Sequence, residues 1–320
     1  MRRTCPALRK ALDTRPRGYS RAVRAPLALL LTAVLALGGA AAADAAPAAG
    51  SVVTAPIRTV HAGQGTIGYR SVGHGRPLVL IMGLSGTMDS WPPAWIDALA
   101  RHRRVIVYDN EGIRRTTLGS APLTVPRMAR DVASLARALH LRKIDVLGWS
   151  MGGMIAQSLA HSFPRLVRRM VLCATAPGDG EATFPSADAA KILTDPTNQS
   201  ALLGVLFPPG NTAALDAFVA GITAYPTATP MAPAAVMAQQ LTASTAWLLG
   251  KEASGRPLRA LRLPVLVGAG ALDQLLPAAN ARHLADSIPG ARRKIYADAA
   301  HGFLFQHTTD FRRRVERFLG

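Results

Sequence analysis

The chain is poor in cysteine. Only Cys5 and Cys173 occur among its 320 residues, which excludes a small scaffold held by several disulfides. Cys173 stands in the apolar run 170–174, so we expect a buried core residue rather than a reactive thiol. Cysteine and histidine form no cluster with the spacing of a metal site. We therefore expect neither a metal nor an organic cofactor.

The N-terminal region lacks a hydrophobic run long enough to span a membrane. Its apolar stretch, Leu27 to Leu37, is shorter than the roughly 20 residues that cross a bilayer. The stretch follows a segment with eight Lys and Arg residues and precedes the small residues Ala41-Ala42-Ala43. This order is typical of a secretory signal peptide, here residues 1–43. It predicts a secreted or periplasmic protein without stable membrane insertion after cleavage; an uncleaved anchor is the alternative.

Acidic residues are scarce. The chain has 19 Asp and Glu against 37 Lys and Arg, which gives a formal charge of +18. Removal of residues 1–43 would take away eight basic residues and one acid and lower this charge to +11. A basic surface can favour anionic substrates or surfaces, but the arginines are scattered, as on an ordinary solvated surface. No segment resembles a nucleic-acid-binding module, so no nucleic-acid partner is expected.

After an Ala/Pro/Gly linker at residues 44–50, residues 51–320 are expected to form one domain. Hydrophobic residues make up 49% of the chain, enough for one sizeable core. Short apolar runs alternate with helical patterns, which predicts an α/β fold with a doubly wound, mostly parallel sheet. An antiparallel edge hairpin is expected at 65–72. The predicted strands are 78–82, 105–109, 144–147, 170–174, 264–268 and 293–297, and the predicted helices are 126–139, 151–161, 278–288 and 309–318.

The alternation breaks at about residues 178–262. This segment is rich in Ala, Pro and Thr and contributes no strand pattern, so we expect a helical cap inserted over the C-terminal edge of the sheet. Its helical patches are 201–207, 215–222 and 231–249. Large apolar side chains could line a substrate pocket under the cap, although most of them could equally be core residues. These candidates are Trp91, Phe207, Phe218, Met231, Met237, Trp247 and Phe303.

The pentapeptide Gly148-Trp149-Ser150-Met151-Gly152 is the most informative motif. It follows the apolar strand pattern 143–147 and precedes the helical pattern 153–160. A serine at the tip of such a turn presents its hydroxyl, and the flanking glycines let neighbouring backbone pass closely. The motif also arises by chance in a glycine-rich chain, in which case Ser150 is an ordinary loop serine. Whether Ser150 is a nucleophile therefore depends on whether the chain also offers a base and an acid.

A serine nucleophile needs a base and an acid that orients the base. His301 follows the last predicted strand, and Asp273 lies in the loop that leaves the preceding strand. The order Ser, Asp, His is one of the known orders of such a triad. An exposed, inert histidine is the alternative for His301. Asp298 is a rival acid, but it lies on the strand side of His301 and close to it in sequence.

Acyl transfer also needs hydrogen-bond donors for the oxyanion. One amide is expected from Met151, which directly follows the nucleophile at the start of its helix. The second is expected from Leu84, in the loop Gly83-Leu84-Ser85-Gly86-Thr87 after the strand 78–82. An ordinary glycine-rich turn is the alternative for this loop.

From about residue 65 to residue 318 the chain resembles the α/β-hydrolase superfamily, in its esterase, haloperoxidase-like and methylesterase branch. The resemblance implies the fold, the Ser150, Asp273 and His301 triad and the cap. Two positions depart from the family pattern, since Met82 stands where a histidine is usual and Glu111 where an arginine is frequent. The matching segments are 82–86, 108–113, 148–154, Asp273 with Pro277, and 301–303.

The sequence therefore predicts an exported serine hydrolase that cleaves a small-molecule carboxylic ester through an acyl-enzyme intermediate. A serine nucleophile argues against the dehalogenase and epoxide-hydrolase chemistry of the same fold. The same triad could instead act on a lactone, a peptide or a carbon–carbon bond, or carry out perhydrolysis. A non-catalytic binding protein on a hydrolase scaffold is the alternative from another class.

Overall fold

The computed structural model describes residues 50–63, 65–195, 199–227 and 231–320. The predicted signal peptide, residues 1–43, and the linker as far as residue 49 lie outside the described residues. Within the described ranges, no helix has both the length and the apolar character needed to cross a membrane.

An eight-stranded sheet forms the centre of the molecule, with the strand order β1-β2-β4-β3-β5-β6-β7-β8. The first two strands run antiparallel, and β2 also pairs antiparallel with β4, whereas the remaining pairs are parallel. The predicted doubly wound, mostly parallel sheet is confirmed. The strands are β1 (Arg58–Ala62), β2 (Gly65–Val72), β3 (Pro77–Ile81), β4 (Arg104–Tyr108), β5 (Ile144–Trp149), β6 (Val167–Cys173), β7 (Val265–Gly270) and β8 (Arg292–Tyr296).

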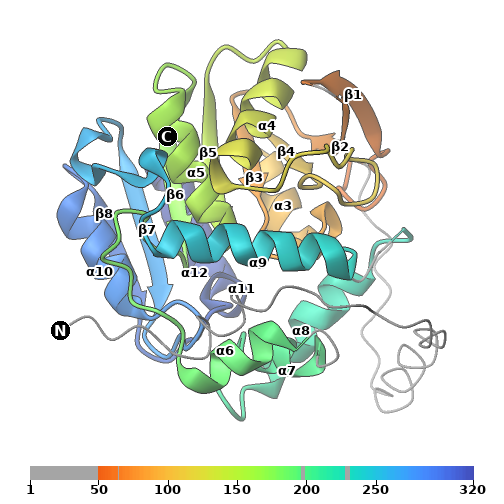
Figure 1. Cartoon of the computed structure of the whole chain (residues 1–320). Helices are drawn as coiled ribbons and strands as arrows, with labels where there is room; N and C mark the ends of the chain where they lie inside the picture. The colour runs from red at the N-terminus through yellow and green to blue at the C-terminus, as the bar shows by residue number, and fades with distance from the viewer. Residues whose placement is uncertain (1–49, 64, 196–198, 228–230) are drawn as a thin grey trace, which may run out of the picture.

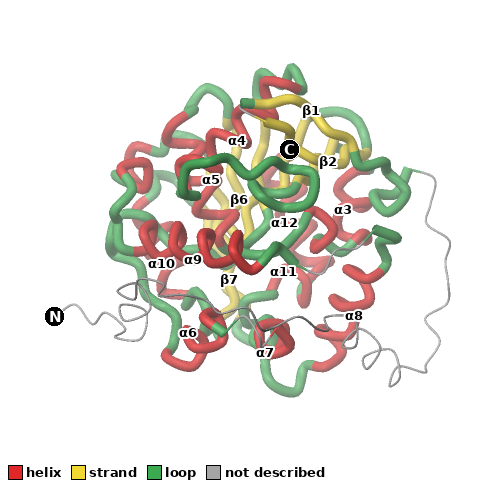
Figure 2. The backbone as a smooth tube through the Cα atoms, turned by 45° about the vertical axis from the view of Figure 1, so that its right-hand side comes forward, coloured by secondary structure: helices red, strands yellow, loops and turns green. Residues whose placement is uncertain are grey.

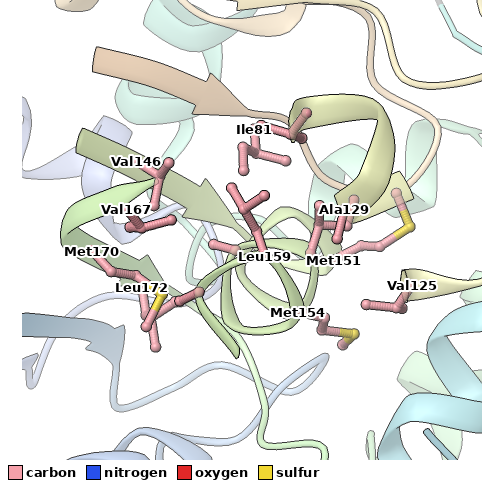
Figure 3. Packing of buried hydrophobic residues seen from close by; sticks show 14 of the residues in the cluster. Ile81, Val125, Ala129, Val146, Met151, Met154, Leu159, Val167, Met170 and Leu172 are labelled. Carbon is pink, nitrogen blue, oxygen red and sulfur yellow. The ribbon is translucent and has the colours of Figure 1, made fainter. Parts of the chain in front are cut away.

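Helices cover both faces of the sheet, which explains why central strands such as β3 and β7 are apolar along their length. In β3, Val79 and Ile81 face one core cluster, while Leu78 and Leu80 face the other. The first cluster packs against α4 (Val125–Ala138), α5 (Met151–Ser162) and α10 (Ala278–Ser287). Figure 3 shows part of it, where Leu159 of α5 lies among strand residues such as Val146 and Val167. The second packs against α3 (Pro93–Ala100), α11 (Phe303–Gln306) and α12 (Thr308–Leu319).

The described residues between β6 and β7 form helices and no strand. It contains α6 (Ala187–Thr194), α7 (Gln199–Gly204), α8 (Thr212–Thr223) and α9 (Ala234–Leu248), followed by the short 3-10 turns η2 (Ala253–Gly255) and η3 (Leu258–Ala260). Figures 1 and 2 show α6, α7 and α8 together in the lower part of the molecule. This inserted segment covers the edge of the sheet where the parallel strands end.

Three helices lie outside the helical patterns named from the sequence, and one edge of the sheet differs from the expectation. These helices are α3, which begins at Pro93, α6, which lies within the expected helical cap, and α11. The segment 65–72 is the second strand rather than the edge, because β1 pairs along its outer side. The sequence of β1, RTVHA, has one strongly apolar residue and is largely exposed, so it carries almost no hydrophobic pattern.

A buried carboxylate ties the start of β5 to neighbouring elements. Asp145 is fully buried and accepts hydrogen bonds from Arg103 at 2.7 Å and from Arg168 at 2.7 and 2.5 Å. The same two guanidinium groups also donate to the backbone oxygens of Gly320 and Leu319, both at 2.6 Å. The Asp145 carboxylate thus holds two arginines that fix the end of α12. The two guanidinium charges make the burial of this carboxylate possible.

The substitution Asp145→Asn should destabilise the fold. The neutral amide leaves two arginines without their counter-charge, and breaking a buried pair in this way costs about 3 kcal/mol of unfolding free energy. Urea denaturation of both proteins measures the difference. Asp286→Asn, which removes the exposed pair with Arg293, serves as the control and should change stability by less than about 1 kcal/mol. Equal effects of the two substitutions would contradict the role assigned to Asp145.

Candidate functional site

Ser150 lies on a tight turn between β5 and α5. Its backbone has φ 58° and ψ −124°, a conformation that a non-glycine residue adopts only when the surroundings enforce it. A Cβ at position 148 would lie 2.2 Å from the Gly152 oxygen, and a Cβ at position 152 would lie 2.0 Å from the Ile81 oxygen. Both glycines are therefore required by close backbone contacts, as the motif predicts.

His301 and Asp273 form a buried pair at the same edge of the sheet. Asp273 lies in the loop after β7 and His301 in the loop after β8; their side chains are joined by a 2.8 Å hydrogen bond between Nδ1 and Oδ2. The other carboxylate oxygen accepts the amides of Leu275 and Leu276, both at 2.9 Å. These bonds fix the carboxylate and leave Nε2 as the imidazole nitrogen available for proton transfer. The rival acid Asp298 pairs with the neighbouring His307 instead, at 3.0 Å.

The residue before the nucleophile connects Ser150 with the histidine loop. The indole of Trp149 donates to the backbone oxygen of His301 at 3.1 Å, and the two rings lie 5.4 Å apart between centroids. Among the described residues, neither Ser150 Oγ nor His301 Nε2 makes a hydrogen bond. Both atoms are thus free for a substrate, and in unliganded enzymes the bond between such groups often tightens only once a substrate is present.

The loop after β3 lies directly beside Ser150. A Cβ at position 83 would lie 3.0 Å from Ser150 Cβ and 3.6 Å from its Oγ. Among the described residues, the backbone amides of Leu84 and Met151 have no hydrogen-bond acceptor, unlike the Ser85 amide, which donates to Gln240 Oε1 at 2.8 Å. Two free amides next to a serine hydroxyl are the arrangement that an oxyanion requires.

Residues that follow β4 hold this loop in place. Asn110 donates from Nδ2 to the Met82 oxygen at 3.2 Å, and Asp109 accepts the Met88 amide at 2.7 Å. Glu111, one of the two departures from the family pattern, makes two hydrogen bonds to Arg127 at 2.6 and 2.8 Å. Glu111 therefore forms an ion pair with the first turn of α4.

A cavity of about 60 Å³ opens beside the nucleophile. Ser150, Leu84 and Met151 all line it, which brings three predicted site residues to one space. The rest of the lining comes from Met154 of α5, from the segment 275–276 and from the inserted helices α6 and α9. Among these, Ser244 and Leu276 were not predicted from the sequence, because neither carries a motif.

The large apolar candidates lie elsewhere. Trp91, Phe207, Trp247 and Phe303 are each at most 3% exposed and belong to the two core clusters. None of the four is among the residues that line the cavity at Ser150. Their hydrophobicity serves packing: Trp91, for example, stacks on Trp95 with ring centroids 5.9 Å apart.

Asp109 should make the stability of the protein depend on pH. Burial raises the pKa of this carboxyl from its usual 3.8 to about 7, although the Met88 amide and Arg114 oppose the shift. The folded protein therefore binds the proton more tightly than the unfolded chain, and stability falls as pH rises from about 4 to 7. Asp109→Asn keeps an acceptor for Met88 and removes this titration.

Thermal unfolding between pH 4.5 and pH 8 tests this assignment. The melting temperature of Asp109→Asn relative to the wild type should rise with pH over this range. Asp188→Asn, at an exposed carboxylate, is the control and should show no such trend. A constant difference between Asp109→Asn and the wild type would contradict the raised pKa.

Comparisons with known proteins show the family of the chain. The family described as alpha/beta hydrolase fold matches residues 76–218. A protein from Serratia proteamaculans assigned as the carbamate hydrolase RutD is 30% identical over 259 residues, 74% of this chain and 88% of the relative. The corresponding protein of Azorhizobium caulinodans is 29% identical over 252 residues, 76% of this chain and 91% of the relative. A solved alpha/beta hydrolase fold protein from Chitinophaga pinensis superposes with a TM-score of 0.76 at 28% identity and covers 84% of this chain and 98% of its own. The chain belongs to the α/β-hydrolase family and is a hydrolase.

Proposed function

We propose that the protein cleaves a carboxylic ester through an acyl-enzyme intermediate, with Ser150 as nucleophile, His301 as base and Asp273 as its orienting acid. One observation carries the proposal: a strained serine and two amides without acceptors line the same cavity, and Trp149 joins this turn to the buried His301–Asp273 pair. Such groups serve acyl transfer, in which negative charge develops on a carbonyl oxygen.

The reaction proceeds in two symmetrical halves. Ser150 Oγ attacks the ester carbonyl carbon while His301 Nε2 takes its proton, and the carbonyl oxygen becomes an anion held by the amides of Leu84 and Met151. The carbon–oxygen bond to the alcohol then breaks, and the alcohol leaves with the proton from His301. Water repeats the sequence on the acyl-enzyme and releases the carboxylic acid. Asp273 stabilises the imidazolium that forms in each half.

Carbamate hydrolysis is a second candidate for the same site. The two relatives described above are assigned as carbamate hydrolases. A carbamate carbonyl needs the same nucleophile and the same oxyanion donors, and it differs from an ester in the nitrogen next to the carbonyl. Initial rates with matched ethyl esters and ethyl carbamates, measured together with lactones, a peptide and a perhydrolysis assay, separate these activities.

Ser150→Ala should abolish turnover of p-nitrophenyl butyrate, with a loss of at least about 10³-fold in kcat, because no other group can form the acyl-enzyme. It should also prevent labelling by a fluorophosphonate probe. Ser162→Ala, at an exposed serine on the same helix, is the matched control and should keep wild-type turnover and labelling. Labelling of the Ser150→Ala protein to wild-type extent would remove Ser150 from the mechanism, whereas a wild-type protein that is not labelled at Ser150 would favour a binding protein on this scaffold.

We also propose that the protein is exported and that residues 1–43 are removed. The basic segment, the apolar stretch and the small residues that follow it support this proposal. Expression of the full chain in a bacterial host, followed by mass spectrometry of the N-terminal peptide in each cell fraction, tests it. The expected mature protein begins at Asp44 outside the cytoplasm. An intact N-terminus in the cytoplasmic fraction alone would contradict export.

A further inference from the structure

One hydroxyl group in the cavity beside Ser150 has no partner. Ser244 lies on α9, lines the cavity and is 7% exposed. Its Oγ is buried and makes no hydrogen bond to any described residue. A buried hydroxyl without a partner is costly, so groups of this kind are normally paired by protein, water or ligand.

The neighbouring hydroxyl groups of α9 are paired within the helix. Thr242 donates to the Ala238 oxygen at 3.0 Å, and Thr245 donates to the Leu241 oxygen at 2.8 Å. Both use the bond that helical Ser and Thr side chains commonly make to the carbonyl four residues earlier. Ser244 does not make this bond. Its hydroxyl is therefore available for a hydrogen bond to a ligand inside the cavity.

The position of Ser244 relative to the reacting atoms is fixed by Gln240, one helical turn earlier on the same face. Gln240 is fully buried, and its Oε1 accepts the amide of Ser85, the residue next to the oxyanion donor Leu84. The Ser85 oxygen in turn accepts the amide of Ala232, just before α9. Two hydrogen bonds thus join α9 to the oxyanion loop. An acyl group bound at Ser150 would therefore lie at a defined position relative to Ser244.

We propose that Ser244 determines substrate specificity, and that the preferred acyl group is short and carries a hydroxyl or carbonyl oxygen that pairs with Ser244 Oγ. This inference rests on the ester-hydrolase function proposed above. A hydroxyl can donate to or accept from such an oxygen. A purely apolar acyl chain would instead displace solvent from Ser244 and leave the hydroxyl unpaired, which lowers its transition-state affinity.

The volume of the cavity limits the size of this acyl group. The cavity is small, at about 60 Å³, and therefore suits a short acyl group. Leucine side chains such as Leu241, Leu248 and Leu276 also line the cavity and suit the carbon atoms of the chain. The hydroxyl groups of Thr194 and Thr245 line it too, but each already donates to a backbone oxygen of its own helix. The unpaired hydroxyl of Ser244 is therefore the polar contact offered to the acyl group, and the predicted substrate is a small hydroxy- or oxo-acyl ester rather than a long-chain ester.

The test compares kcat/KM for methyl butyrate with kcat/KM for methyl 2-hydroxybutyrate and methyl 3-hydroxybutyrate. The wild type should prefer at least one hydroxy ester over butyrate. Ser244→Ala should reduce that preference about tenfold, which corresponds to the loss of one hydrogen bond. Because all three esters are measured on the same protein, the ratio of their kcat/KM values is independent of the fraction of enzyme that is correctly folded.

Thr242→Ala is the matched control, since it removes an exposed hydroxyl from the same helix that is already bonded to Ala238. It should leave the preference as in the wild type. A wild type that hydrolyses butyrate faster than both hydroxy esters, or a Ser244→Ala protein with an unchanged ratio, would overturn the role of Ser244 while ester hydrolysis stands. No turnover of any of the three esters by the wild type would overturn the ester-hydrolase proposal and this inference with it.

Discussion

The close approach of backbone to backbone at the turn around Ser150 is the constraint on which the rest of the site depends. The positive φ of Ser150 is held by a hydrogen bond from its amide to the Cys173 oxygen at 2.8 Å. The close contact of Gly152 with the end of β3 also holds it. Strain of this kind persists only inside a rigid, fully packed surrounding. The buried strands on both sides of β5 provide it. The serine is positioned by the sheet rather than by its own loop.

The other site groups reach the same edge because parallel strands end together. The oxyanion loop follows β3, the serine follows β5, Asp273 follows β7 and His301 follows β8. The inserted segment then binds two of these loops directly. Gly302 donates its amide to the Leu206 oxygen at 2.6 Å, while Ser85 is held by α9. The inserted segment therefore holds the loops of the proposed base and oxyanion donors and also lines the cavity.

Buried ion pairs give the arginine-rich composition a structural use. The scattered arginines were expected to form a solvated surface, yet Arg70 and Arg103 are only 3% and 5% exposed. Arg70 pairs with Asp89 at 3.1 Å, and the same carboxylate pairs with Arg114 at 2.6 Å. Both arginines also hydrogen-bond Thr227 of the inserted segment. A guanidinium suits such positions because its five donors can satisfy a carboxylate and a backbone oxygen together.

The sequence by itself determined the fold class, most strand positions and the candidate site residues after strand ends, because these depend on local patterns: apolar runs, a Gly-x-Ser-x-Gly turn and the order of Ser, Asp and His. Only the tertiary structure decided what surrounds them. Trp91 and Phe303 pack in the core, whereas Ser244, which carries no motif, lines the same cavity as Ser150. Which side of a helix meets a distant strand end depends on contacts between segments almost a hundred residues apart, and no local pattern encodes that contact.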